Sequence, residues 1–211
     1  MIITIDGPAA AGKGTLARQL AEHLNLAYLD TGLIYRAVGK KVIGAGGMPE
    51  DAETSEAAAQ NLCSDDLAED GLRTDEVATA ASKVSAVPGV RAALLDFQRD
   101  FAVRPPGGKM GAVLDGRDIG TVVCPAADHK LFVTASIDVR AQRRVKELQD
   151  RGLEAIYARV FEDMEERDAR DQQRASSPLE PAVDAHTLDT TDLTVEQVFR
   201  AALKFIRSSK A

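Results

Sequence analysis

A segment of small residues near the N-terminus carries the clearest chemical signal in the sequence. Its members are Gly7, Pro8, Ala9, Ala10, Ala11, Gly12, Lys13, Gly14 and Thr15. Because small side chains leave backbone N–H groups accessible, such a loop can surround phosphates while its lysine reaches the β- and γ-oxygens. The strict form of this phosphate-binding loop, the P-loop, has Ser or Thr directly after the lysine, whereas Gly14 stands there and Thr15 follows. We predict that these residues bind ATP and that Lys13 is catalytic.

Two further clusters have the composition of a site for a second anionic ligand. One contains Thr31 with Arg36 five residues later, and the other is Arg117-Asp118 between two glycines. An arginine can bind a phosphate bidentately, and Asp118 can accept a hydrogen bond from an exocyclic amine or a ribose hydroxyl. The alternatives are a helix N-cap at Thr31 and a salt-bridged turn at Arg117-Asp118. Arg91, which follows Pro88 near the start of a predicted helix, either faces the same region or lies on the surface.

Arginines are concentrated between residues 140 and 174, where eight occur. Arg167, Arg170 and Arg174 share one face of a predicted helix, and Asp171 lies four residues after Arg167 and can orient it. Planar guanidinium groups suit the charge that spreads over phosphoryl oxygens during transfer, so we predict that these three arginines are catalytic. The alternative is a solvated helix with i,i+4 ion pairs. The preceding segment repeats the spacing at Arg140, Arg143 and Arg144, which predicts a hairpin lid that excludes water when it closes.

Short apolar runs that alternate with helical patterns must position these residues. The expected strands cover residues 2–5, 27–29, 111–114, 130–135 and 186–188. The expected helices cover residues 13–24, 31–43, 74–87, 88–101, 137–151, 155–174 and 194–208. This alternation predicts an α/β fold with a parallel sheet that is covered by helices on both faces. Ligands bind beyond the carboxyl ends of such strands, where the P-loop, Thr31 and Arg117 are expected.

Length and charge predict one domain with an acidic insert. The chain has 211 residues, of which 45% are hydrophobic, and a net charge of −7. Residues 46–72 hold eight acidic residues and no Lys or Arg, and the remaining 25 acidic and 26 basic residues nearly balance. We expect a core (1–45, 73–150 and 175–211), a short insert (46–72) on the acceptor side and a lid (151–174).

Composition also limits the classes of function. The sequence lacks a basic stripe for nucleic acid, an apolar run of membrane-spanning length and a signal peptide, so we expect a cytoplasmic protein. Cys63 and Cys124 form neither a metal spacing nor a disulfide framework. We expect a monomer, because domain closure needs free hinges. We predict no metal ligand set within the chain, and Mg²⁺ is expected to arrive with ATP.

The ordered motifs resemble those of the bacterial cytidylate kinase family. The matching stretches are ITIDGPAAAGKGT, YLDTGLIYRAV, LRTDEVATAASKVSAVPGVR, LDGRDIGTVV and ERDARDQQRASSPLEPAVDAHTLDTT. The resemblance covers most of the chain. It implies a P-loop kinase fold with a five-stranded parallel sheet, an insert that binds a nucleoside monophosphate and a helical lid. It also implies transfer of the γ-phosphoryl of ATP to CMP or dCMP.

The resemblance further implies roles for individual residues. Thr31 matches a position near the cytosine, and the positions that read the base are Ser82, Arg91 and Asp118. Arg36 and Arg117 match positions on the acceptor phosphate. Arg167 and Asp171 match a pair that holds the ribose hydroxyls, which is why such relatives accept dCMP as well as CMP, and Arg174 matches a lid arginine near the phosphates. The family's longer insert, with its small antiparallel sheet, is replaced here by the short acidic segment.

Other functions remain open from the residues alone. A P-loop kinase for another nucleoside monophosphate or for a small hydroxyl acceptor is the first alternative, although a hydroxyl acceptor would need a deprotonating carboxylate. A nucleotide sensor without turnover is the second. A GTPase is not favoured, because a guanine reader begins Asn-Lys and both asparagines, Asn25 and Asn61, are followed by Leu.

Overall fold

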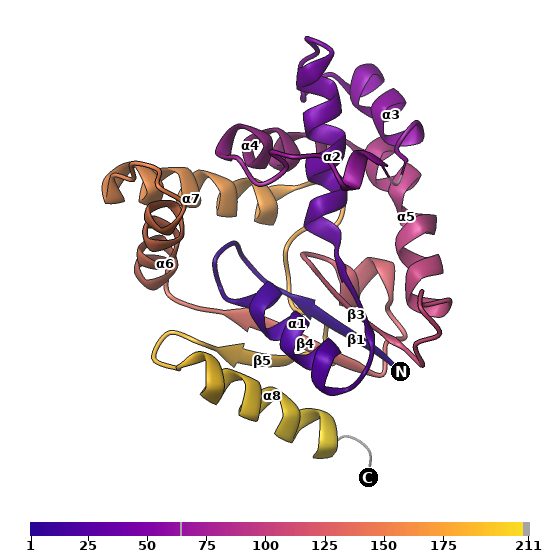
Figure 1. Cartoon of the computed structure of the whole chain (residues 1–211), viewed down its shortest axis with the longest axis vertical. Coiled ribbons are helices and arrows are strands. Elements are labelled where there is room, and N and C mark those ends of the chain that lie inside the picture. Colours follow the sequence, from indigo (N-terminus) through magenta and orange to yellow (C-terminus); the bar gives the residue numbers. More distant parts are fainter. Residues whose placement is uncertain (64, 209–211) are drawn as a thin grey trace.

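Five short strands form one parallel sheet at the centre of the molecule (Figure 1). The computed structural model describes residues 1–63 and 65–208, so residue 64 of the predicted insert and residues 209–211 of the predicted core lie outside the described part. The strands are β1 (Ile2–Asp6), β2 (Ala27–Asp30), β3 (Ala112–Gly116), β4 (His129–Thr134) and β5 (His186–Asp189). Their order is β2-β3-β1-β4-β5, and every neighbouring pair is parallel. The predicted sheet is confirmed, and the carboxyl ends of its strands share one edge.

Helices cover both faces of this sheet, as predicted. Helices α1 (Lys13–His23) and α8 (Val195–Ser208) pack on the face to which Ile3 and Ile5 point, and both side chains are fully buried. Helix α5 (Pro88–Val103) and a single π-helical turn, η2 (Ile119–Val123), pack on the opposite face. Since side chains alternate along a strand, Thr4 and Asp6 point toward η2.

The chain between β2 and β3 builds a second layer of helices on the acceptor side. It consists of α2 (Thr31–Gly44), α3 (Ala52–Gln60), the 3₁₀ turn η1 (Asp65–Leu67), α4 (Asp75–Val84) and α5. Helices α2 and α4 pack so closely at Gly39 that a Cβ there would lie 2.9 Å from the backbone nitrogen of Ala81. Buried Ile34, Val38 and Val84 join these helices to α5 in a second apolar core.

The described residues of the acidic insert, 46–63 and 65–72, include one helix and one 3₁₀ turn. Its helix α3 begins with Asp51 as N-cap, whose side chain accepts a hydrogen bond from the backbone N–H of Thr54. Two lysines of α2 neutralise part of its charge: Lys40 pairs with Glu69 at 2.5 Å, and Lys41 pairs with Asp66 at 2.8 Å. The segment is therefore attached to α2 by charge as well as by apolar contacts.

Helices α6 (Ile137–Asp150) and α7 (Tyr157–Gln173) form a hairpin beside the carboxyl edge of the sheet (Figure 1). The two helices share a small apolar core of Ala141, Leu148, Val160 and Met164. This hairpin contains the predicted lid, although the division of the chain into core, insert and lid stays a prediction. Within residues 1–63 and 65–208, no helix has the length and apolar character that crossing a membrane requires.

Candidate active site

The P-loop connects β1 to α1 and adopts a backbone that its small residues make possible. Gly7 has φ 142°, and a Cβ on it would lie 1.9 Å from the carbonyl oxygen of Val133. Gly12, at the N-cap of α1, has φ 95°, and Ala10 also takes a positive φ of 57°. The loop therefore presents backbone N–H groups at a helix N-terminus, an arrangement that binds phosphate.

Lys13 is the buried cation of this loop. Its Nζ donates a hydrogen bond to the carbonyl oxygen of Pro8 at 2.8 Å, and the residue is 7% exposed. Burial, followed by repulsion from the guanidinium of Arg117, lowers the pKa of Lys13 to about 7. An incoming phosphate would restore the charged form, because opposite charge favours it.

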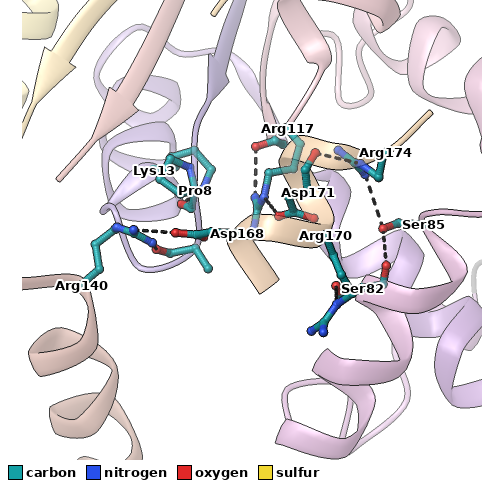
Figure 2. A network of polar contacts seen from close by, with 12 residues as sticks. Pro8, Lys13, Ser82, Ser85, Arg117, Arg140, Asp168, Arg170, Asp171 and Arg174 are labelled. Carbon is teal, nitrogen blue, oxygen red and sulfur yellow. Dashed lines mark hydrogen bonds and ion pairs between the residues drawn. The ribbon is translucent and has the colours of Figure 1, made fainter. Parts of the chain in front are cut away.

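Arg117 and Asp118 do not pair with each other, so the interpretation as a salt-bridged turn is wrong. Arg117 donates its Nε to Asp171 Oδ2 at 2.8 Å, a contact between the end of β3 and helix α7 (Figure 2). Asp118 pairs instead with Arg91 of α5. Asp171 was expected to orient Arg167, but the ion pair that the structure records for it goes to Arg117. Both pairs are largely buried, and each joins distant segments of the chain.

Two serines accept hydrogen bonds from Arg170 of α7 and from Arg174, which directly follows this helix. Arg170 Nε donates to Ser82 Oγ at 3.4 Å, and Arg174 Nη1 donates to Ser85 Oγ at 3.5 Å. Figure 2 shows these contacts beside the Arg117–Asp171 pair. The structure thus brings the predicted Ser82, Arg91, Arg117, Asp118, Arg170, Asp171 and Arg174 into one contact network.

Several arginine N–H groups in this network are buried without a hydrogen-bond acceptor among the described residues. They are Arg91 Nε, Arg167 Nε and Arg174 Nη2. Buried polar groups are nearly always satisfied in folded proteins, so these guanidinium N–H groups are available to donate to an anionic ligand. The pKa of Arg167 is lowered to about 10 by burial and then by the nearby Arg117. The site therefore holds more positive charge than its own carboxylates balance.

Two predicted acceptor-side residues have partners that sequence reasoning did not identify. Thr31 is not the N-cap of α2, because Asp30 holds that position and accepts from the backbone N–H of Leu33. The Thr31 hydroxyl donates instead to the carbonyl oxygen of Asp115 at 2.7 Å. Arg36 donates to the carbonyl oxygen of Leu72 at 3.0 Å. Burial lowers the pKa of Arg36, and the nearby carboxylate of Asp30 opposes that shift.

The arginine network and the P-loop resemble a site for two phosphorylated ligands, and known proteins support this comparison. The sequence model of the cytidylate kinase family matches residues 3–208. A relative from Paramagnetospirillum magneticum named cytidylate kinase is 66% identical over 209 residues and covers 99% of both chains. Another relative with that name, from Rhodospirillum rubrum, is 58% identical and covers 98% of this chain and 97% of its own. This chain belongs to the cytidylate kinase family. The resemblance of its motifs to that family is confirmed.

The family fold is also found in more distant structures. A crystal structure of an uncharacterized protein from Eubacterium ventriosum matches with a TM-score of 0.59 over 99% of each chain, at 13% sequence identity. Likeness at this identity concerns the fold alone. This match supports the α/β architecture of the chain.

A cavity behind the P-loop contains residues that the sequence did not single out as ligand-binding. It has a volume of about 420 Å³, and its lining includes Ala10, Gly12, Thr15, Arg143, Thr190 and Leu193. Arg143 Nη2 donates to the carbonyl oxygen of Thr190 at 2.7 Å, and the Thr190 hydroxyl donates to the carbonyl oxygen of Ala11 at 3.1 Å. The available signal was the spacing of Arg143 with Arg140 and Arg144. The contribution of Thr190 depends on sheet order, which the local sequence does not reveal.

Other unpredicted residues hold the site together. Arg140, on α6, donates to the carbonyl oxygen of Ala9 at 3.3 Å and to Asp168 Oδ2 at 2.6 Å, so it connects the P-loop to α7. The ring centre of Tyr35 lies 5.6 Å from the guanidinium carbon of Arg91. These contacts fix arginines that would otherwise sample many rotamers.

The carboxylate of Asp115 lies close to the start of α1. A Cβ on Gly14 would lie 3.2 Å from Asp115 Oδ2, and Tyr28 donates its hydroxyl to the same oxygen at 3.4 Å. Burial, followed by repulsion from Asp30, raises the pKa of Asp115 to about 6. In the described residues, no group of three or more His, Cys, Asp or Glu side chains gathers in a metal-binding arrangement. Asp115 and the Thr15 hydroxyl nevertheless offer the oxygen donors that Mg²⁺ prefers beside nucleotide phosphates.

Proposed function

We propose that this chain transfers the γ-phosphoryl of ATP to CMP or dCMP, giving ADP and CDP or dCDP. The observation that carries the proposal is the set of buried, unpaired guanidinium N–H groups of Arg91, Arg167 and Arg174 on the acceptor side of Lys13. A P-loop accounts for one phosphorylated nucleotide, and this second cationic site suits another. The family of the chain and the names of its relatives support cytidine as the acceptor base.

Each predicted residue has a role in this proposal. The amides of residues 7–15 and the amine of Lys13 hold the phosphates of ATP, and the cavity that Arg143 and Thr190 line takes its base. Arg36 and Arg117 hold the phosphate of CMP. The remaining acceptor contacts are to the cytosine, from Thr31, Ser82, Arg91 and Asp118, and to the ribose, from Arg167 and Asp171.

The chemical step needs position and charge more than proton transfer. A phosphate oxygen of CMP attacks the γ-phosphorus as the bond to the β,γ-bridging oxygen breaks, and ADP leaves with that electron pair. The CMP phosphate is already an anion near neutral pH, so no general base is required. Lys13, Arg167, Arg170 and Arg174 stabilise the negative charge on the transferring group. Helix α7 carries Arg167 and Arg170, and Arg174 directly follows it, so the approach of this helix to the P-loop completes the site.

Mg²⁺ bound to ATP would neutralise phosphate charge and orient the β- and γ-phosphates. Asp115 and Thr15 are the residues we propose to hold it, with phosphate oxygens completing its coordination. The raised pKa of Asp115 fits this role, since a nearby cation would favour the charged carboxylate.

A coupled ADP-release assay tests the function. CMP, dCMP, UMP and AMP are compared as acceptors at equal concentration with Mg²⁺ and ATP. We expect CMP and dCMP to give the highest kcat/KM, and equal or better turnover of AMP would refute the cytosine acceptor while leaving a kinase. A Lys13→Ala variant is the control that separates an enzyme from a nucleotide sensor, because only an enzyme has turnover to lose.

We also propose that the protein acts in the cytoplasm, as a monomer, in pyrimidine nucleotide metabolism. Its proposed partners are ATP and CMP or dCMP, and we propose no role for nucleic acid or membrane. Domain closure needs free hinges, which supports a monomer. Sedimentation velocity with and without both nucleotides tests this state, and a stable dimer at assay concentrations would contradict it.

A further inference from the structure

Asp118 stands at a position where aspartate ordinarily caps a helix, but its side chain does not do so. It directly precedes the π-helical turn η2 as the N-cap, and no hydrogen bond runs from the turn to its carboxylate. An N-cap aspartate usually accepts from one of the first free N–H groups of its own helix. Here the carboxylate of Asp118 turns away from η2 and pairs with Arg91.

The missing cap comes from Asp6, which lies on a different strand. Asp6 Oδ1 accepts from the backbone N–H of Ile119 at 2.8 Å, and Asp6 Oδ2 accepts from the backbone N–H of Gly120 at 2.7 Å. Both oxygens of one carboxylate thus satisfy the two N–H groups that Asp118 leaves free. Asp6 is 5% exposed and directly precedes Gly7, so the same residue touches the start of the P-loop and the start of η2.

We infer that Asp6 is a positioning residue for base selectivity: by capping η2 in place of Asp118, it keeps the Asp118 carboxylate on Arg91 and available to the acceptor base. This inference rests on the proposed function, in which Asp118 accepts a hydrogen bond from the exocyclic amine of cytosine. Uracil carries a carbonyl oxygen where cytosine carries that amine, and a carbonyl oxygen has no hydrogen to donate to a carboxylate. The orientation of Asp118 therefore discriminates CMP from UMP.

Burial of the ionised Asp6 carboxylate costs stability. Burial raises the pKa of Asp6 to about 6, against the lowering effect of the two backbone N–H bonds, and Asp118 adds repulsion while Lys13 offsets some of it. Among the described residues, no salt bridge neutralises this carboxylate. An uncharged residue would be cheaper to bury, but only a carboxylate offers two acceptor oxygens to the N–H groups of Ile119 and Gly120.

The test variant is Asp6→Asn, which keeps the shape of the side chain but offers only one acceptor oxygen. The variant leaves one N–H group of η2 unpaired, and rotation of the Asp118 side chain back onto η2 would satisfy that group. We expect the preference for CMP over UMP, measured as the ratio of kcat/KM values, to fall by at least about tenfold, as for loss of a hydrogen bond to a charged group. The KM for ATP should change by less than about twofold, and the unfolding temperature should change little because removal of the buried charge offsets the lost hydrogen bond.

Thr4→Val supplies a matched control on the same strand and the same face. Thr4 is fully buried, and its hydroxyl has no hydrogen-bond partner among the described residues. This variant should leave the selectivity and both KM values unchanged, so it separates the effect of Asp6 from general disturbance of β1.

A double-mutant cycle with Asp118→Asn decides whether Asp6 acts through Asp118. If it does, D6N added to D118N lowers selectivity no further than D118N alone. Three outcomes would each overturn the inference. They are additive losses of selectivity in the double variant, equal changes in the KM values for ATP and CMP, and a lower unfolding temperature with intact selectivity. Calorimetric Kd values for CMP and UMP measure the same preference without turnover. Failure of the proposed function would appear separately, as absence of CMP turnover by the unaltered chain.

Discussion

The buried pair between Arg117 and Asp171 provides the sharpest test of how charge is balanced in this site. We consider Asp171→Asn, which removes the charge but keeps one acceptor oxygen. The backbone of Asp171 has its own partners, since its carbonyl oxygen accepts from the N–H of Leu179 at 2.8 Å and from Arg174 Nε at 3.3 Å. The variant therefore leaves the end of α7 attached and changes the charge alone.

The expected loss follows from the geometry of the pair. Unit charges about 4 Å apart attract by about 4 kcal/mol at an effective dielectric constant of about 20, and removing one member of a buried pair costs about 3–5 kcal/mol. The Asp171 side chain is 5% exposed, but that of Arg117 is 19% exposed, so water compensates part of the loss. We expect the free energy of unfolding to fall by about 2–3 kcal/mol at pH 7.

The dependence on pH identifies the carboxylate as the cause. Burial opposes the ionisation of Asp171, but the nearby guanidinium groups, Arg117 first, outweigh it and hold the pKa of Asp171 below its usual value. A carboxylate with a lowered folded-state pKa stabilises the fold above the unfolded pKa of about 4, and that stability is lost as the pH falls through the folded value. The difference between wild type and variant should therefore be complete at pH 7 and shrink below pH about 4.

Urea unfolding of both proteins at pH 7 and pH 3.5 is the assay, with inorganic phosphate as a second variable. Phosphate should stabilise D171N more than wild type, because the unpaired Arg117 attracts an anion. Asp150→Asn is the control: Asp150 pairs with Lys146 at 3.1 Å in an exposed i,i+4 contact of α6, so its loss should cost less than about 0.5 kcal/mol. If D171N is no less stable than D150N, the pair does not balance charge in the way that we infer.

Three further outcomes test other parts of the site. Lys13→Met should lower kcat by at least about a hundredfold. Folded Lys13 has a pKa of about 7, so above this pH it gives up a proton that the unfolded chain still binds. Wild-type stability should therefore rise from pH 7 to 9 relative to this variant in urea unfolding. Gly7→Ala should destabilise the fold by more than about 3 kcal/mol in the same assay, since its Cβ would meet the Val133 carbonyl, whereas Gly46→Ala, in open space at φ 74°, should cost about 1 kcal/mol. Arg143→Met should raise the KM for ATP more than the KM for CMP in initial-rate assays, because Arg143 lines the cavity behind the P-loop; equal increases would contradict this assignment.

The sheet and most helices could be predicted because local sequence determines them. Buried strands appear as short apolar runs, and Thr74, whose side chain accepts from the backbone N–H of Val77, marks the start of α4. The strand order could not be predicted, because it depends on pairing between residues about a hundred positions apart. The π-helical turn 119–123 was also missed, since it is too short to show a helical pattern and its first N–H groups are satisfied by Asp6 from a distant strand.

The sequence indicated which residue types form the site better than it indicated their ion-pair and hydrogen-bond partners. Sequence spacing suggested that Asp171 would orient Arg167, and it offered a salt bridge between Arg117 and Asp118 as the alternative to ligand binding. The structure instead pairs Arg91 with Asp118 and Arg117 with Asp171, across segments that only the fold brings together. Charge pairs are chosen by proximity in space, so a sequence can indicate which side chains do chemistry without indicating which ones hold them in place.

The balance of charge predicts that bound nucleotides stabilise this molecule. Burial, followed by repulsion from Arg117, lowers the pKa values of both Lys13 and Arg167, so three cations on three different segments repel one another across the site. Anions bound between them would turn that repulsion into attraction on all three elements at once. Ligands that bind only the folded state also stabilise it by mass action. The phosphates of ATP and of the acceptor would therefore stabilise the position of α7 beside the P-loop, because each phosphate replaces repulsion between cations with attraction to an anion.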